Sequence, residues 1–377
     1  MNNKKINEFI SGFIDSPISV KILKTFKIFR GSKKNPPVSI KKILIIKLEG
    51  LGDSIYITEI IHRLKEEYPG LKIDVLTTKQ NPIFSTFKET NDEFDIISFN
   101  PLNLIDYFKI IGYIKKNEYD AVFDMTGMPV NIPLMLFFVN SYKIGFNSAP
   151  VKTALYDRLV NLEEDIHIFE NYLNLFTPLF DIKKLDKQFT LKLPALEKES
   201  KELKKGEYIN LALSSNSGGL MHRMLPLANS LKLINLLRSE FVNYEINLLG
   251  GQNDYKYLEL INNNLKEKAS IKKTKSIKEV FLLLQNSFLN ICIDSGLMHI
   301  SSLVNQNTYC LFGYSNPKNS LPFNNIGYFW SNLDCSPCSF YKISTCNNPV
   351  NLKCMEEINI DKVIEDVRLK GKAKTNI

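Results

Sequence analysis

The sequence contains no long hydrophobic run. None of its apolar stretches reaches the roughly 18 residues that a membrane-spanning helix needs. Its first 15 residues also lack the pattern of a secretory signal peptide, because Glu8 and Asp15 interrupt a short apolar segment and no small-residue cleavage site follows. We therefore expect a protein that stays in the cytoplasm.

The body of the chain also lacks any excess of charge. Residues 1–42 hold ten basic and two acidic residues, which accounts for the whole net charge of +8. The rest shows no basic stripe with interleaved aromatic residues, so nucleic acid is not an expected partner. With 44% apolar and 23% charged residues the composition is that of a globular protein. A length of 377 residues predicts two domains of about 150 residues each.

The basic residues belong to an N-terminal arm and linker, residues 1–40. Apolar side chains recur there at helical spacing, and the lysines fall away from that face. Such a segment suits an anionic membrane surface, where it would hold the protein at the inner face of the cytoplasmic membrane. A helix packed on the protein's own flank fits the same pattern, and both interpretations stay open. The apolar positions are Ile18, Ile22, Phe26 and Phe29.

Strand-like and helix-like segments alternate along the body, which predicts an α/β protein with parallel sheets. The first series has predicted strands at Ile43–Leu48, Lys72–Leu76, Phe94–Ile97 and Ala121–Phe123, with helices at Thr58–Tyr68 and near Leu104–Lys115. The second has strands at Tyr208–Leu213, Glu245–Leu249, Phe288–Ile293 and Asn307–Phe312, with helices near Leu227–Glu240, Tyr255–Asn264, Ile277–Gln285 and Met298–Val304.

A polar, lysine-rich stretch separates the two series. We expect an N-terminal Rossmann-like domain over residues 41–182, an interdomain linker region over 183–206, and a C-terminal Rossmann-like domain with a cysteine-rich tail over 207–377. Two Rossmann-like domains facing across a cleft follow from this order of elements.

The first predicted strand ends in Gly50-Leu51-Gly52-Asp53 and leads into a helix. A dinucleotide fingerprint would have a third glycine at position 55, where this chain has isoleucine, and that disfavours a dehydrogenase. Asp53 is a candidate general base at the end of the strand. By itself the motif favours an acid that caps the helix or complements its dipole.

A second motif, Asp294-Ser295-Gly296-Leu297-Met298-His299, also joins a strand to a helix. Backbone N–H groups at such a helix start bind phosphate without side-chain charge. Asp294 is a candidate to hold the turn or a ligand hydroxyl, and His299 lies one turn into the helix. A plain N-cap and a core histidine are the structural alternatives.

Two further strand ends carry polar or small residues. Ser214 and Ser215 begin a polar loop that leads to Arg223, and hydroxyls with a guanidinium suit a diphosphate leaving group. Gly250, Gly251 and Gln252 follow another strand and could admit a ribose or base. Each is weak evidence alone, but together they predict a nucleotide site in the C-terminal domain.

Four of the six cysteines are clustered in the tail, as Cys335, Cys338, Cys346 and Cys354. In a cytosolic chain clustered thiols favour metal over disulfides. A four-cysteine zinc site would be structural, because no coordination position stays open. Reduced thiols without metal are the alternative.

The chain resembles glycosyltransferase family 9, the ADP-heptose:lipopolysaccharide heptosyltransferases, from about Lys42 to Val367. The segments that carry the resemblance are KLEGLGDSIYITEIIHRLKEEYPGLKIDVL, YDAVFDMTG, KIGF, SSNSGG with HRMLP, LLGG, and DSGLMHISSLVNQNTYCLFG. The resemblance implies a GT-B fold and inverting transfer that requires no metal or other cofactor. It makes Asp53 the catalytic base and assigns the donor diphosphate to Ser295, Gly296 and His299, with Asp294 and the Ser214–Ser215 loop beside it.

The resemblance further implies an ADP-heptose-like donor and a lipopolysaccharide core acceptor. Candidate acceptor-side residues are Gly52, Asp124, Thr126 and Lys143. The chain departs from the family where Arg223 replaces a usual lysine and Leu225 a usual aromatic residue, which puts the identity of the sugar in doubt. Alternatives are a transferase for another nucleotide-sugar and a non-catalytic nucleotide-sugar-binding protein.

Overall fold

The computed structural model describes residues 21, 25, 35–79, 81–89, 92–100, 103–126, 131–148, 150–181, 206–215, 223–338, 346 and 348–373. The chain divides into two compact units, Met1–Asp186 and Lys187–Ile377. Most of the predicted arm and all of the predicted linker region except Gly206 lie outside the described residues. The predicted domain bounds therefore stay a prediction. None of the helices described is at once long and apolar enough to cross a bilayer.

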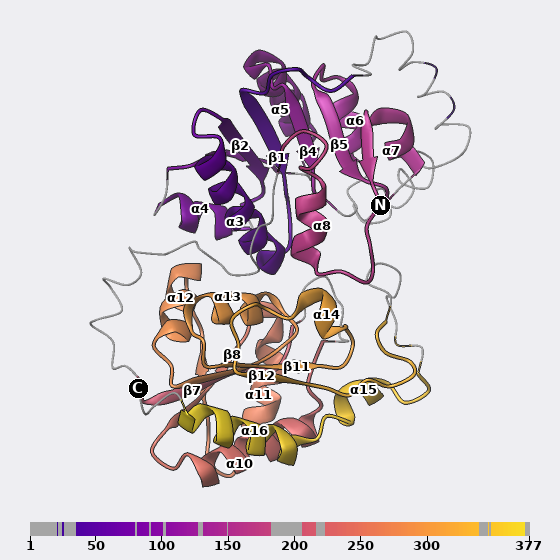
Figure 1. Ribbon diagram of the computed structural model, residues 1–377. Helices are drawn as coiled ribbons and strands as arrows, with labels where there is room; N and C mark the ends of the chain where they lie inside the picture. The colour runs from indigo at the N-terminus through magenta and orange to yellow at the C-terminus, as the bar shows by residue number, and fades with distance from the viewer. Residues whose placement is uncertain are drawn as a thin grey trace. The chain divides into compact units, whose positions relative to one another are not determined.

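The N-terminal unit is built on a parallel sheet of six strands in the order β3-β2-β1-β4-β5-β6 (Figure 1). Its strands β1 and β2 are completely or almost completely buried, since helices cover both faces of the sheet. The strands are β1 (Lys42–Ile46), β2 (Lys72–Thr77), β3 (Asp95–Ser98), β4 (Ala121–Asp124), β5 (Tyr142–Phe146) and β6 (Arg158–Val160).

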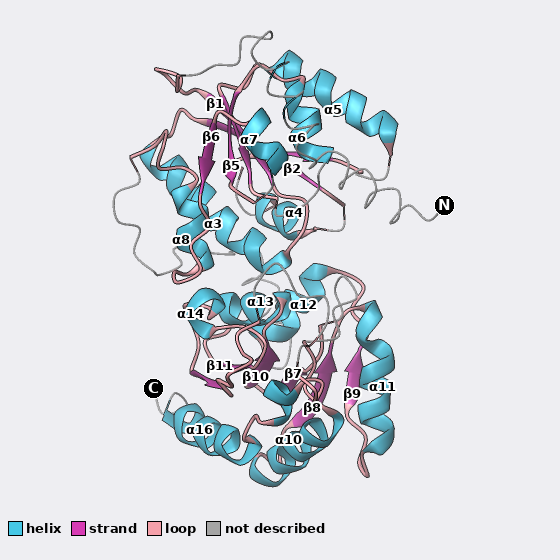
Figure 2. Ribbon diagram, turned by 90° about the vertical axis from the view of Figure 1, so that its right-hand side faces the viewer, coloured by secondary structure: helices cyan, strands magenta, loops and turns pink. Residues whose placement is uncertain are grey.

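Among the described residues, six helices surround this sheet. On one face α3 packs against α4 and α8, and on the other a buried apolar cluster joins the sheet to α5, α6 and α7. Figure 2 shows α5 at the outer surface of the unit. The helices are α3 (Leu51–Glu67), α4 (Ile83–Lys88), α5 (Leu104–Asn117), α6 (Asn131–Phe137), α7 (Pro150–Leu155) and α8 (Ile168–Asn174).

The C-terminal unit repeats the architecture with a parallel sheet in the order β12-β11-β10-β7-β8-β9. The strands are β7 (Tyr208–Ala212), β8 (Glu245–Leu249), β9 (Ser270–Lys272), β10 (Leu289–Ile293), β11 (Thr308–Phe312) and β12 (Gly327–Trp330). One buried cluster joins the sheet to α10, α11 and α16, while α12 and α13 pack together. The helical elements are α10 (Leu227–Glu240), η2 (Gln252–Asp254), α11 (Tyr255–Asn264), α12 (Ile277–Gln285), α13 (Gly296–Val304), α14 (Pro317–Ser320), α15 (Lys353–Glu356) and α16 (Ile360–Ala373).

Both sheets have the strand order of a doubly wound Rossmann fold, in which ligands bind where the strand order reverses. In the N-terminal unit that point lies between β1 and β4, and in the C-terminal unit between β7 and β10. The predicted α/β class with parallel sheets is confirmed, and so are the eight predicted strands, within a few residues at their ends. The strands β5, β6, β9 and β12 were not predicted from the sequence, and β6, β9 and β12 are edge strands with partly exposed residues.

A chain of buried asparagines crosses the C-terminal sheet. The Asn210 amide donates to Oδ1 of Asn290 at 2.9 Å, and the Asn247 amide donates to Oδ1 of Asn210 at 3.1 Å. The three residues lie opposite one another on β10, β7 and β8. Because side chains alternate between the faces of a strand, a slip of one residue would separate these amides. They fix the register of the three strands.

Candidate functional site

The loop after β1 is held in place by side chains of its surroundings. The Thr78 hydroxyl donates to the carbonyl of Leu48 at 3.0 Å. The Ser54 hydroxyl donates to the carbonyl of Gly50 at 2.8 Å and accepts from the amide of Asn81 at 2.8 Å. These hydrogen bonds therefore fix the conformation of the loop between β1 and α3.

Asp53 lies in the first turn of α3 and contacts a buried lysine. Nζ of Lys47 is 2.9 Å from Oδ2 of Asp53 and 3.0 Å from the hydroxyl of Tyr172 on α8. The Lys47 side chain is 7% exposed, whereas that of Asp53 is 34% exposed. The N-cap of α3 is Gly50, so Asp53 does not cap the helix. The buried cation contacts the carboxylate and orients it, and the carboxylate keeps a face open to solvent.

Gly50 is required by the geometry of this turn. Its φ of +87° is one that residues with a side chain rarely adopt. A Cβ atom built there would lie 2.8 Å from Oδ2 of Asp53. Glycine at this position therefore leaves the space that the carboxylate occupies.

Asp124 and Thr126 follow β4, which is the other strand at the reversal point. Asp124 is completely buried and accepts from the backbone N–H of Thr126 at 2.9 Å. Nζ of Lys152 lies 3.1 Å from its Oδ2, and Tyr156 donates to the same oxygen. Burial, together with the charge and hydrogen bond of Asp124, raises the pKa of Tyr156 well above its ordinary value. In this conformation Asp124 organises the strand end and has no exposed surface.

Lys143 lies elsewhere in the same sheet. It is the second residue of β5, and parallel pairing sets it opposite Val122, toward the amino ends of the strands. Its Nζ donates to the carbonyl of Ser141 at 3.2 Å. The sheet therefore brings Gly52, Asp53, Asp124 and Thr126 to one edge, without Lys143.

In the C-terminal unit, β10 delivers Asp294 and Ser295 to the start of α13. Asp294 accepts a hydrogen bond from Ser315, which follows β11. Ser295 is the N-cap residue of α13 but makes no capping bond with its side chain. Gly296 begins the helix, and the first N–H groups of a helix have no acceptor within it. This end of α13 has the features of an anion site.

The loop after β7 brings Arg223 to the same edge. Residues 216–222 are not described, but both ends of the loop are joined, since the N–H of Ser215 donates to the carbonyl of Arg223 at 2.8 Å. The Arg223 guanidinium lies 5.3 Å from the ring centre of Tyr314. Tyr314 and Ser315 follow β11, and Ser315 binds Asp294. Arg223 therefore extends from β7 across the end of β10, where α13 begins.

Three buried polar atoms of this region have no hydrogen-bond partner among the described residues. They are Oγ of Ser214, Oγ of Ser295 and Nε of Arg223. A buried polar group left unpaired costs about 1–3 kcal/mol, so such groups indicate a missing ligand or water. All three belong to the set that the sequence assigned to the donor diphosphate.

The remaining donor candidates lie on adjacent elements. Gly250 and Gly251 follow β8, and the Gly251 N–H donates to Oδ2 of Asp254 at 2.9 Å. A Cβ atom at Gly250 would lie 2.8 Å from Cβ of Asp254. Gln252 begins η2 and is exposed, and His299 is half-buried on α13. The glycines thus permit a tight turn beside the β7 edge.

The four tail cysteines are electrostatic neighbours. Burial raises the pKa of the Cys338 thiol, and the thiols of Cys346 and Cys335 raise it further. Burial, together with the thiols of Cys338, Cys335 and Cys346, raises the pKa of Cys354 to about 11. All four are free of disulfides. Within the described ranges, however, no three His, Cys, Asp or Glu side chains are arranged as ligands of a metal ion.

The sequence reasoning missed four residues near these sites. Lys47 had a detectable signal, because a lysine directly after a buried strand must find a partner. Tyr314 and Ser315 had the weaker signal of polar residues after the strand β11. Tyr172 had none, since its contact with Lys47 spans 125 positions of sequence.

Comparison with known proteins gives consistent results. The model of glycosyltransferase family 9 (heptosyltransferase) matches residues 107–346. Lipopolysaccharide heptosyltransferase 3 of Escherichia coli is 25% identical over 297 residues, which cover 74% of this chain and 86% of that protein.

Two solved structures share the fold. A glycosyl transferase family 9 protein from Veillonella parvula superposes with a TM-score of 0.73 at 16% identity, covering 89% of this chain and 99% of that one. The ADP-heptose lps heptosyltransferase II of E. coli gives 0.68 at 16% identity, with the same two coverages. The predicted GT-B fold, with two Rossmann-like domains, is confirmed by these likenesses.

Proposed function

Because the chain belongs to glycosyltransferase family 9, and is therefore a glycosyltransferase, we propose that it moves a heptose or related sugar from an ADP-sugar to a lipopolysaccharide core or another lipid-linked saccharide. The observation that carries the proposal is the unpaired set of Ser214, Arg223 and Ser295 at the start of α13. These groups suit a nucleoside diphosphate, and the E. coli relative that shares this fold is an ADP-heptose lps heptosyltransferase.

In the proposed reaction an acceptor hydroxyl attacks the anomeric carbon from the face opposite the diphosphate, which inverts the configuration. Asp53 takes the proton of that hydroxyl as the new bond forms. Lys47 holds the carboxylate in position through the contact of 2.9 Å. The acceptor would lie beside Gly52 and beside Asp124 and Thr126 at the end of β4. Lys143 would have only a structural role.

The bond between the anomeric carbon and the diphosphate breaks as the new bond forms, so negative charge grows on the leaving ADP. The N-terminus of α13, with Ser295 and Gly296, and the guanidinium of Arg223 would stabilise that charge. Asp294, His299 and Ser215 would complete the phosphate side, with Gly250, Gly251 and Gln252 beside the nucleoside. The proposed transfer does not require a metal ion at the diphosphate.

A separate proposal concerns the four tail cysteines, for which structural zinc and reduced thiols without metal stay the two alternatives. Their clustering in the sequence favours zinc, whereas no three His, Cys, Asp or Glu side chains of the described residues are arranged as ligands of a metal ion. Cys335, Cys338, Cys346 and Cys354 would supply four thiolates and hold the tail, with no role in transfer. Elemental analysis of the purified protein tests this, and a protein free of zinc with unchanged stability after chelation would contradict it.

The proposed acceptor is borne by a membrane, so we also propose that the protein works at the inner face of the cytoplasmic membrane. The basic arm of residues 1–40 supports this through its charge alone.

The proposed function is tested with purified protein, ADP-heptose and a heptose-deficient lipopolysaccharide core. Mass spectrometry of the acceptor is expected to show the added heptose, with release of one ADP per transfer. Binding of ADP-heptose without transfer to any core acceptor would favour the non-catalytic alternative. Transfer from a different nucleotide-sugar would correct the donor. Lipopolysaccharide from a deletion strain would identify the sugar that is lost.

A further inference from the structure

Helix α5 carries apolar side chains on the face that points away from the core. Ile110 and Ile114 are buried against the sheet, as an amphipathic helix requires. On the opposite face Ile105 is 63% exposed and Phe108 is 75% exposed. Single exposed apolar residues are ordinary, but these two lie three positions apart on one helix face, where their side chains are neighbours.

Three lysines lie on the same face of α5 as these two side chains. Lys109, Lys115 and Lys116 are exposed on α5 and form no ion pair with any described residue. At 100° per residue, Ile105, Phe108 and the three lysines fall within a single half of the helix circumference. The acid of this helix, Asp106, lies in the first turn and accepts from the N–H of Asn100. The exposed face is therefore apolar and cationic together.

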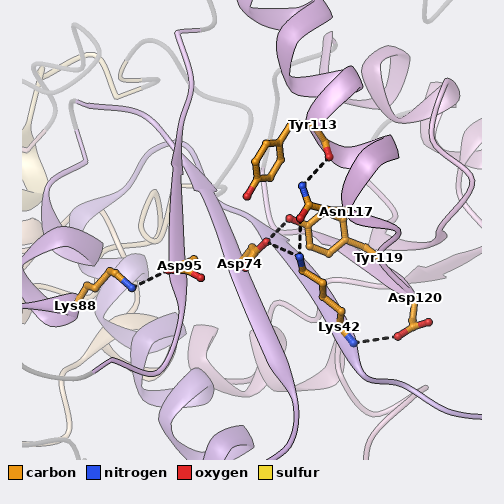
Figure 3. Close-up of polar contacts among 8 residues, drawn as sticks. All are labelled: Lys42, Asp74, Lys88, Asp95, Tyr113, Asn117, Tyr119 and Asp120. Atoms are coloured by element: carbon orange, nitrogen blue, oxygen red, sulfur yellow. Dashed lines mark hydrogen bonds and ion pairs between the residues drawn. The ribbon is translucent and has the colours of Figure 1, made fainter.

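The orientation of α5 is fixed at its C-terminal end. Nζ of Lys42 on β1 donates to Oδ1 of Asn117 at 2.8 Å and lies 3.4 Å from Oδ2 of Asp74. Figure 3 shows the ring of Tyr113 directed at the Asp74–Tyr119 pair, so its hydroxyl faces inward although the residue is 40% exposed. The helix cannot roll to bury Ile105 and Phe108 without breaking these contacts.

The apolar end of α5 lies at the functional edge of the sheet. The helix begins at Leu104, six residues after β3 ends at Ser98, so its first turns are at the carboxyl ends of the strands. Asp53 lies in the first turn of α3 at that same edge. A surface bound by Ile105 and Phe108 would therefore lie on the side of the unit where the acceptor is expected.

We propose that the exposed face of α5 docks on an anionic lipid bilayer, with Ile105 and Phe108 inserted at the headgroup level and Lys109, Lys115 and Lys116 on lipid phosphates. Apolar residues followed on the same helix face by lysines that form no ion pair with a described residue match such a surface in both hydrophobicity and charge. This site is distinct from the N-terminal arm. The link to the acceptor rests on the proposed function, but docking itself does not.

Vesicle sedimentation of the full chain tests the docking surface. The vesicles contain phosphatidylcholine with 30% or without phosphatidylglycerol, and no donor or acceptor is present. Two variants are compared with the wild type, namely Ile105→Ser with Phe108→Ser, and Lys109→Gln with Lys115→Gln and Lys116→Gln. Each is expected to bind anionic vesicles about tenfold or more weakly, because each removes one of the two contributions.

The matched control is Val242→Ser with Leu260→Ser, which removes two exposed apolar side chains of the C-terminal unit. It is expected to bind as the wild type does. Unchanged binding by both α5 variants, or equal loss in the control, would overturn the proposal. Loss of a wild-type dimer in the Ile105–Phe108 variant, with vesicle binding intact, would assign the face to a second copy of the chain instead. Transfer to a delipidated core in solution should be unaffected, which separates this test from that of the proposed function.

Discussion

Nζ of Lys47 lies 2.9 Å from Oδ2 of Asp53, and the lysine is buried while the aspartate is one-third exposed. The pair therefore has an inner cation and an outer anion. A surface ion pair would contribute little, but a buried amine must keep its partner, because removal of one member leaves an uncompensated charge. The carboxylate that we propose to face the acceptor is thus held on its buried side by a residue that need not touch substrate.

Replacement of Asp53 by asparagine should abolish transfer and leave the fold intact. The amide keeps the shape of the side chain but cannot take a proton, so kcat should fall by about 10²–10⁴-fold. The matched control is Asp106→Asn, which changes an acid in the first turn of α5. Turnover is measured as ADP release, and circular dichroism monitors folding. Full turnover by a folded Asp53→Asn protein would remove Asp53 from the role of base.

Substitution of Lys47 should lower kcat through the orientation of Asp53. Lys47→Gln is expected to reduce kcat by about tenfold or more, with little change in ADP affinity, because the nucleotide candidates belong to the other unit. Lys47→Arg should recover part of the loss, since it restores the charge. Lys42→Gln, which removes another partly buried lysine of β1, serves as the control. An ADP affinity that falls in step with kcat would instead indicate general damage to the protein.

Gly50→Ala should harm both stability and activity. The positive φ disfavours alanine by about 1–3 kcal/mol, and the new Cβ would contact the carboxylate of Asp53. Gly70→Ala is the control, since a Cβ there meets nothing within 4 Å. Urea denaturation and kcat are measured together. Wild-type values of both for Gly50→Ala would show that the turn tolerates a side chain.

Arg223→Met should weaken ADP binding, because the guanidinium lies 5.3 Å from the ring centre of Tyr314, next to Ser315, whose hydroxyl binds Asp294 before α13. Loss of a charge-assisted contact of about 1.5–3 kcal/mol predicts an affinity about tenfold or more lower. Calorimetric titration with ADP measures this without any acceptor. The control is Arg238→Met, which loses hydrogen bonds to the carbonyls of Glu267 and Lys268. Equal affinities of the two variants would exclude Arg223 from the donor site.

Alkaline pH should unfold the protein through its buried tyrosines. Burial, with a carboxylate hydrogen bond, raises the pKa of Tyr119, Tyr156 and Tyr309 above the ordinary value near 10. Above pH 10 the unfolded chain loses these protons and the folded chain keeps them, so the free energy of unfolding falls as pH rises. Each such tyrosine contributes about 1.4 kcal/mol per pH unit in that range.

Phenolate absorbance, followed against pH alongside circular dichroism, provides the measurement. A group of tyrosines should ionise only together with unfolding. Gradual ionisation of all sixteen tyrosines near pH 10 in a folded protein would contradict this.

The sequence was sufficient for elements with strong local signals. The buried strands β1, β7 and β10 are short apolar runs that end at glycine, serine or aspartate, and their positions as site-bearing strands follow from that pattern. The start of α13 at Ser295 and Gly296 is equally local. Edge strands such as β6 and β9 have only three residues each, which is too few for a periodic pattern.

Contacts between distant segments were beyond local reasoning. Nothing near Asp124 indicates that Lys152 and Tyr156 will enclose it, because those residues come from α7 and the turn after it. The same holds for Tyr172 beneath Lys47. The candidate acceptor residues were therefore chosen by position along the chain, and the sheet separates Lys143 from the rest.

The asparagine chain across β10, β7 and β8 bears on how rigid the nucleotide site is before any nucleotide arrives. Apolar residues at Asn210, Asn247 and Asn290 would hold the strands together but would tolerate alternative alignments. Hydrogen-bonded amides do not tolerate alternative alignments, so the positions of the three strand ends relative to one another are fixed by contacts inside the sheet. The loops that follow start from prearranged positions, and the entropy lost on ligand capture is correspondingly smaller. Affinity at the proposed nucleotide site would thus depend in part on residues inside the sheet.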